Sequence, residues 1–260
     1  MTIIPPVVPP LSMERPYARN LAPGAAFEWL RDGWRDLTAN PGTSLLYGLL
    51  VFVLSAGIVA GLIWLAWDYA LFPAIAGFLV FAPALAIGLY DKSRALEQGG
   101  PVSLRHMLLP HARAGGQVLF IGALLCGVML LWMRAAVIIY ALFFGVRPFP
   151  GLDHIAPMLF TTSTGIAMLI VGTLIGGLFA AFSFAISAFS IPMMLDRRVD
   201  ALTAMGTSWS LVWNNLPAML VWGCLVLALF LLSVATGFLG LIVVFPWLGH
   251  ATWHAYRAVR

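Results

Sequence analysis

Charged side chains are scarce in this sequence. Only 9% of the 260 residues are Asp, Glu, Lys or Arg, while 62% are hydrophobic. A soluble globular domain has about 25% charged residues, so this composition excludes a water-soluble globular protein and indicates one dissolved in lipid. The small net charge of +4 gives no reason to expect a nucleic-acid partner.

Cysteine and catalytic motifs are also scarce. Cys126 and Cys224 each stand alone in an apolar run, and we expect both to be small buried side chains. The sequence has no GxSxG, P-loop, GxGxxG or HExxH motif. Its ten carboxylates lie outside the predicted spans or at their ends, so no buried acidic relay is expected. We therefore predict neither an enzyme nor a cofactor.

Long apolar runs dominate the chain instead. A membrane-crossing helix needs about 20 such residues, and six segments meet that requirement. They predict an all-α polytopic membrane protein, with six transmembrane helices arranged as three hairpins. The predicted spans cover residues 44–67, 70–90, 117–145, 156–192, 216–236 and 238–256.

Basic residues predict the orientation of these spans. Twelve of the 14 Lys and Arg residues fall on one side of the predicted bundle, which places both termini in the cytoplasm. Arg147 lies on the other side, and Arg134 lies within the third span. We expect Arg134 to reach the outer interface or pair with a carbonyl group, and a functional charge is the alternative.

An internal repeat organises the chain. The segment "AFEWLRDGWRDLTANPGTSLLYGLL" matches "ALTAMGTSWSLVWNNLPAMLVWGCL", and "GFLVFAPAL" matches "GLIVVFPWL". The second match pairs Pro83 with Pro246, which we expect to kink equivalent helices. Four spans separate the copies, so the repeat is parallel. The predicted repeat units cover about residues 26–94, 101–198 and 201–257.

These units form one predicted membrane domain over residues 25–260. It follows a flexible, Pro-rich cytoplasmic tail over residues 1–24. Each clear copy begins with an amphipathic helix at the membrane surface, which serves as an anchor or, alternatively, as a docking surface. In the first copy, the predicted apolar face comprises Ala26, Phe27, Leu30, Gly33, Trp34 and Leu37.

Small residues recur at four-residue spacing within two of the spans. This spacing lets helices approach closely, either within the chain or against a protein partner or second copy. The residues are Gly57 and Gly61 in the first span. In the fourth span they are Gly172, Gly176 and Ala180, and a separate pair, Ser183 and Ser187.

The segment "PWLGHATWHAYR" at the C-terminal end holds the candidate site. His250 and His254 lie four residues apart and so share one helix face; the candidate cluster comprises His250, His254, Trp247, Trp253 and Arg257. We predict a structural feature of a helix end at a wet, half-apolar boundary. The alternative is a metal or haem site. Since a catalytic metal needs about three protein ligands, His106 or His111 would have to join the pair.

The repeat, "SWSLVWNN" and "PWLGHATWHAYR" resemble a bacterial family of integral membrane proteins, the domain-of-unknown-function family 2189. The resemblance covers about residues 25–257 and implies six spans. Some family members carry a cytochrome c oxidase label. The oxidase core subunit holds its haems and copper with histidines deep in its helices, and in this chain no histidine is predicted deep in a span. The label is therefore consistent with an accessory subunit and not with the catalytic core.

Two functions are consistent with these patterns. The first is a non-catalytic, partner-binding or accessory membrane protein, in the narrower form a subunit of a respiratory complex. The alternative is a small-solute transporter or channel. It predicts a polar cavity lined by hydroxyl groups of the fourth span, among them Ser183, Ser187 and Ser190.

Overall fold

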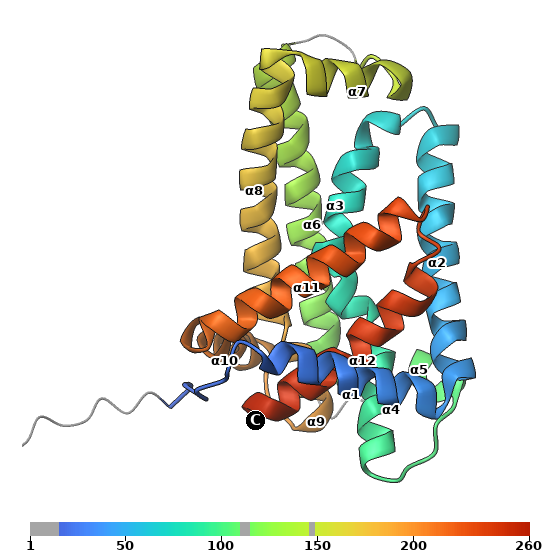
Figure 1. Ribbon diagram of the computed structural model, residues 1–260, viewed down its shortest axis with the longest axis vertical. Helices are drawn as coiled ribbons and strands as arrows, with labels where there is room; N and C mark the ends of the chain where they lie inside the picture. The colour runs from blue at the N-terminus through green and yellow to red at the C-terminus, as the bar shows by residue number, and fades with distance from the viewer. Residues whose placement is uncertain (1–15, 110–114, 146–148) are drawn as a thin grey trace, which may run out of the picture.

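The computed structural model describes residues 16–109, 115–145 and 149–260. Every element in these ranges is helical (Figure 1), and they contain no strand, which confirms the all-α prediction. The helices are α1 (Ala25–Ala39), α2 (Pro41–Trp64), α3 (Leu71–Leu85), α4 (Ile87–Glu97), α5 (Leu104–Leu108), α6 (Gly115–Phe144), α7 (Leu152–Thr161), α8 (Ser163–Ser187), α9 (Ser190–Asp196), α10 (Ala201–Asn214), α11 (Leu216–Ala235) and α12 (Leu241–Val259), with a 3-10 turn, η1, at Asp68–Ala70.

Several helices are long and apolar enough to cross a membrane. Within the described residues there are five such stretches: Pro41–Trp64, Asp68–Glu97, Gly115–Phe144, Ser163–Asp196 and Leu216–Ala235. The chain is therefore an integral, multi-pass membrane protein. The predicted sixth span is not among them. It corresponds to α12, whose C-terminal half carries histidine and arginine and is largely buried against the protein.

The long helices form two groups (Figure 1). In one, α3, α6 and α8 pack against each other along the long axis of the molecule. In the other, α12 packs along α1 and α2. Helix α11 is inclined across the bundle, and its turn into α12 lies well short of the level reached by the far ends of α2 and α8. Helices α1 and α7 lie across opposite ends of the molecule.

An asparagine followed closely by a proline ends each of the two surface helices. Asn40 ends α1 and precedes α2, and Asn215 ends α10 and precedes α11. A proline in the first turn of α2 and of α11 suits a position where no intrahelical donor is needed. The chain therefore turns sharply from each surface helix into an apolar helix.

The prediction that both cysteines are buried is wrong. Cys126 and Cys224 are exposed, because they lie on outward faces of α6 and α11 where lipid replaces protein contacts. On α1, part of the predicted apolar face is open to the surroundings: Phe27 is 59% exposed and Trp34 is 44% exposed, whereas Trp29 is buried. The buried face of α1 is set by α12, which packs against it.

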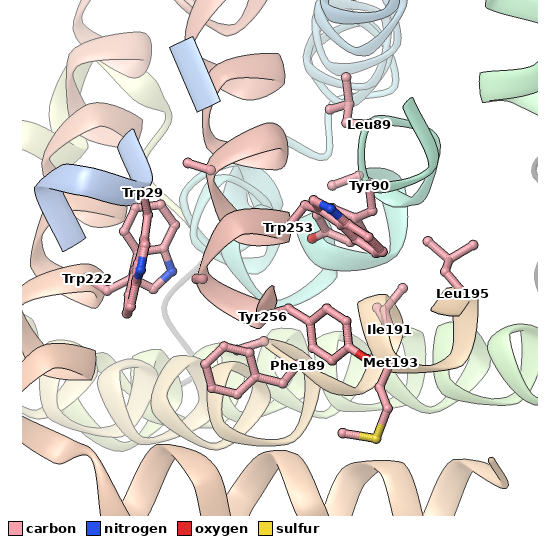
Figure 2. Close-up of a cluster of buried hydrophobic side chains, with 14 of the residues drawn as sticks. Trp29, Leu89, Tyr90, Phe189, Ile191, Met193, Leu195, Trp222, Trp253 and Tyr256 are labelled. Carbon is pink, nitrogen blue, oxygen red and sulfur yellow. The ribbon is translucent and has the colours of Figure 1, made fainter. Parts of the chain in front are cut away.

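A dense apolar core occupies the end of the bundle near the C-terminus. Figure 2 shows Trp29 of α1 facing Trp222 of α11, with ring centroids 5.8 Å apart and nearly perpendicular rings. The side chains of Trp253 and Tyr256, from α12, lie 5.5 Å apart between centroids. Burial of such rings contributes strongly to stability, so the core holds α12 in place beneath the spanning helices.

The small residues of α8 are not equivalent in their packing. A side chain added at Gly176 would lie 2.8 Å from Cη2 of Trp132, whereas Gly172 has open space. Trp132 cannot easily retreat, because its indole donates to the carbonyl of Pro73 at 2.9 Å. Close helix packing within the chain is thus seen at Gly176.

We expect Gly176→Val to destabilise the protein by about 1–3 kcal/mol, the usual cost of overpacking. Gly172→Val on the same helix is the matched control and should change stability by less than about 0.5 kcal/mol. Unfolding temperatures in mild detergent would check both values. Equal losses in the two variants would contradict the assigned contact.

Candidate functional site: a buried histidine network

His250 lies at the centre of the candidate site. Its side chain is 0% exposed, so the predicted wet boundary is wrong for this residue. Nε2 lies 2.8 Å from Oγ of Ser44 on α2, and Nδ1 lies 2.8 Å from Oγ of Ser93 on α4. Both ring nitrogens are therefore bonded within the protein, and His250 joins three helices.

The hydrogen-bonded chain continues beyond both serines. On one side, Nζ of Lys92 donates to Oγ of Ser44 at 2.7 Å and to the carbonyl of Asn40 at 2.7 Å. On the other side, the Ser93 hydroxyl lies near the carboxylate of Asp36 and helps to lower its pKa. Asp36 Oδ2 also lies 2.8 Å from Nε2 of His254. We call Lys92, Ser44, His250, Ser93, Asp36 and His254 the histidine network.

The Lys92 end of the histidine network fixes the direction of its hydrogen bonds, because the Lys92 ammonium can only donate. Ser44 therefore accepts from Lys92 and donates its hydroxyl proton to Nε2 of His250. The Nδ1–H group of the neutral ring then donates to Oγ of Ser93. His250 is thus the neutral Nδ1–H tautomer.

The electrostatics agree with this assignment. Burial, assisted by the nearby Lys92 charge, lowers the pKa of His250 to about 3, so its ring is neutral at pH 7. Burial acts to raise the pKa of Asp36, but hydrogen bonds from His254 and Ser93 outweigh it and leave that pKa below its usual value. The buried Lys92 cation is thus connected to a neutral imidazole through Ser44.

The other predicted site residues bind different partners. The Trp247 indole donates to the carbonyl of Leu30 at 2.7 Å. Arg257 forms an ion pair with Glu97 at 2.6 Å. Trp253 is buried, and its Nε1 has no hydrogen-bond partner among the described residues. The structure thus brings His250 and His254 into one network and gives Trp247 and Arg257 separate contacts to α1 and α4.

A second polar cluster lies near the C-terminus. Tyr256 donates to Oδ2 of Asp196 at 2.8 Å, and Arg260 pairs with the same oxygen at 3.0 Å. Arg19, in the predicted tail, donates to the carbonyl of Val259 at 2.9 Å. The N-terminal segment from residue 16 is therefore held against α12, and the described ends of the chain lie together.

Sequence reasoning missed Asp36, Lys92 and both serines of the histidine network. Asp36 and Lys92 were not singled out, because periodicity cannot show which surface another helix covers. One signal was present: Lys92 lies one turn after Gly88, where a side chain would lie 2.1 Å from the carbonyl oxygen of Met107. Such close helix approach buries neighbouring side chains.

The described residues provide no set of ligands for the metal site considered above. They contain no group of three or more His, Cys, Asp or Glu side chains placed to hold a metal ion. His106 lies exposed on α5, where its backbone N–H donates to Oγ of Ser103 at 3.3 Å. His111 lies outside the described residues. A ligand role for His250 would require its bonds to both serines to break.

Arg134 and the two prolines also have defined places. Arg134 is exposed on α6 and forms no ion pair or hydrogen bond with any described residue, so the predicted carbonyl pairing is absent there. Arg147 lies outside the described ranges. Pro83 and Pro246 lie inside α3 and α12, and Pro83 lines an apolar cavity of about 100 Å³, whereas Pro246 does not.

The serines near the end of the fourth predicted span do not line this cavity. Ser187 and Ser190 donate to the carbonyls of Ser183 and Ile186, each at 2.6 Å. Ser183 Oγ is buried without a partner among the described residues. The polar, hydroxyl-lined cavity expected for a transporter is therefore not formed at this place.

The neutral state of His250 predicts a pH dependence of stability. In the unfolded chain its pKa is about 6.5, so between pH 6.5 and 3 the unfolded state binds more protons and stability falls as pH decreases. From pH 7 to pH 5 we expect a loss of about 2 kcal/mol. Asp36 contributes mainly below pH 4, since its folded pKa is lowered.

Unfolding temperatures at pH 7 and pH 5 would test this dependence in the wild type and in His250→Gln. The variant lacks the titrating ring but keeps Lys92, Asp36 and His254, the charged and titratable groups around it. It should lose less stability at pH 5 than the wild type does. Identical losses would show that His250 does not titrate on unfolding.

These helices and the histidine network define a multi-pass integral membrane protein with a polar cluster buried at one end. Residues 71–196 match the family described as "Predicted integral membrane protein (DUF2189)". The predicted resemblance is thereby confirmed from α3 through α9. No curated protein and no solved structure matches the chain.

Proposed function

We propose that this chain is a non-catalytic membrane protein that acts by binding a protein partner within the bilayer. The observation that supports this proposal is the use of its polar side chains. The groups most suited to chemistry are bonded to other side chains of the protein: His250 to Ser44 and Ser93, Lys92 to Ser44, and Asp36 to His254. These bonds join α1, α2, α4 and α12. Polar groups bonded in this way hold the helices together. The function is therefore assigned to the outer surface of the protein.

We place partner contact on the outward face of α2. Side chains added at Gly57 and Gly61 would meet nothing within 4 Å, and the neighbouring Val53, Leu54 and Ile58 are more than half exposed. Small residues flanked by large ones favour close packing of a second transmembrane helix. The proposed partner is therefore a membrane protein with a complementary helix, or a second copy of this chain.

Crosslinking in native membranes followed by mass spectrometry would test the proposal. We expect a specific partner with the wild type and its loss in Gly57→Leu/Gly61→Leu. Leu174→Phe, on the exposed face of α8, is the control and should keep the partner. Recovery of a monomer alone from wild-type membranes would contradict partner binding, and retention by the double variant would contradict the α2 face.

Association with a respiratory complex is the narrower form of this proposal. It rests on the oxidase label carried by some proteins that the sequence resembles. The same crosslinking experiment would test it, since subunits of a terminal oxidase should be among the captured proteins. Solute transport, the alternative function, has no supporting feature in the cavity beside Pro83, whose lining is apolar.

We further propose that α11 and α12 form a re-entrant hairpin rather than two full spans. Figure 1 places their turn short of the far ends of the other helices. Backbone groups at membrane depth must be bonded internally. Every amide from Thr236 to Gly240 donates to a partner within the hairpin, which suits a turn surrounded by lipid.

Cysteine labelling would test the hairpin in a background with Cys126 and Cys224 replaced by serine. A membrane-impermeant maleimide should label Trp67→Cys, in the turn between α2 and α3, from one side of the membrane. It should label Leu239→Cys from neither side. Labelling of Leu239→Cys from the same side as Trp67→Cys would instead favour six full spans.

The parallel repeat and the cytoplasmic location of both termini belong to the same proposal. The matching positions of Asn40 and Asn215 between paired helices support the repeat. The bond from Arg19 to Val259 supports termini on one side, and basic residues favour the cytoplasmic side. A reporter enzyme fused to either end should be active only in the cytoplasm, and activity outside would reverse the orientation.

A further inference from the structure

An apolar cavity of about 100 Å³ separates the two groups of helices. It is bounded by α3 and α8 on one side and by α11 and α12 on the other. The Phe78 ring stacks on Phe230 with centroids 5.5 Å apart and meets Phe245 edge-on at 5.9 Å. These rings come from α3, α11 and α12 and meet beside the cavity, which Trp222 and Ala188 also line.

The cavity lining offers little to water. Its hydroxyl groups belong to Tyr90 and Thr252, and Thr252 donates to the carbonyl of Leu248 at 2.8 Å. An ordered water needs about two to four polar partners, and an apolar cavity of about 150 Å³ stays dry and binds small hydrocarbons. The chemistry of this cavity therefore selects a hydrocarbon group.

The arrangement of α11 gives such a group a way in from the bilayer. Helix α11 packs chiefly on α12, α1 and α10, whereas α3, α6 and α8 pack on one another. At the boundary between these groups, Phe184 of α8 and Val226 of α11 line the cavity and are only half-buried. Both helices are long and apolar enough to cross the membrane, so this boundary faces lipid chains.

We propose that the cavity is a binding site for the hydrocarbon chain of a membrane lipid, which enters between α8 and α11. Protein interiors are densely packed, and the atoms that line an unfilled space lose dispersion contacts. A lipid chain restores those contacts. It also couples the inclined α11–α12 hairpin to the other helices, since its methylene groups touch both.

Photolabelling of the full chain in phosphatidylcholine vesicles would test this site. The probe is a phosphatidylcholine with a diazirine in the middle of one acyl chain. After irradiation, peptide mass spectrometry should find label on Phe184 and Val226 of the cavity as well as on the outward Leu178. Leu178 is 70% exposed and serves as the internal reference for lipid contact in every sample.

Two cavity-filling variants, Ala188→Phe and Ala82→Leu, should lose the cavity label while keeping that on Leu178. The control Leu174→Phe, on the outward face of α8, should keep both. Wild-type label confined to outward side chains would overturn the proposal, as would full cavity label in a filled variant. If neither filled variant folds, the wild-type pattern alone decides. This outcome does not depend on the proposed protein partner.

Discussion

Replacing Gly48 with valine is expected to prevent α2 and α12 from packing and to abolish the folded state in detergent. Even the Cβ atom would lie 2.2 Å from the carbonyl oxygen of Ile242 and 2.9 Å from Cγ of Pro246. The first of these is a backbone atom, so no rotamer change relieves the clash. The loss of stability should exceed the roughly 1–3 kcal/mol that is usual for overpacking.

The expected effect is large because this contact aligns the histidine network. Gly48 lies one helical turn after Ser44, which bonds to His250. Moving α12 away from α2 therefore breaks a buried hydrogen bond as well as the packing. Size-exclusion profiles and unfolding temperatures in mild detergent would measure the loss.

Gly57→Val is the matched control on the same helix. Its Cβ would meet nothing within 4 Å, so the substitution carries only a small change in helix propensity, about 0.5 kcal/mol or less. A Gly48→Val protein as stable as Gly57→Val would contradict the close approach of α2 and α12.

The second large effect is expected for His250→Leu. This change removes both ring nitrogens. The buried Ser44 hydroxyl then keeps its bond from Lys92 but loses the acceptor for its proton, and the buried Ser93 oxygen loses its donor. Each unsatisfied group costs about 1–3 kcal/mol, so the total loss is about 2–6 kcal/mol. Thermal unfolding in mild detergent at pH 7 would measure it.

His254→Leu is the control for that experiment, since His254 occupies the same helix face one turn later. Its side chain is 28% exposed and bonds to one carboxylate, so its removal should cost about 1 kcal/mol. A double-mutant cycle with Ser44→Ala should show non-additivity with His250→Leu of about 1 kcal/mol and none with His254→Leu. Equal losses of stability in the two variants would contradict the assignment of His250, rather than His254, as the buried centre of the network.

The structure divides the predicted C-terminal cluster into residues with different surroundings. The sequence pattern correctly placed His250 and His254 on one helix face, and the two do join one network. It could not show that the first is enclosed while the second reaches the surface. That difference arises because serines of α2 and α4 enclose the His250 ring from both sides, whereas His254 bonds only to a carboxylate of α1.

The amphipathic helix α1 gives a similar lesson. Its apolar residues span more than one face, so spacing alone was compatible with either Phe27 or Trp29 inside. The structure buries Trp29 against Trp222 and exposes Phe27. The choice depends on where α12 and α11 lie, which is not encoded within the fifteen residues of α1.

The sequence by itself determined that this protein lies in a membrane, that it is all helical, and where its long apolar runs are. These properties follow from local quantities, namely the length of apolar runs, the helical period and the residues that interrupt them. Only the tertiary structure decided that the predicted fourth span is divided into α7, α8 and α9, and that Lys92, Ser44, His250 and Ser93 form one chain of hydrogen bonds. Those residues come from segments as much as 206 positions apart, and a buried polar group finds its partner through helix packing rather than through sequence spacing.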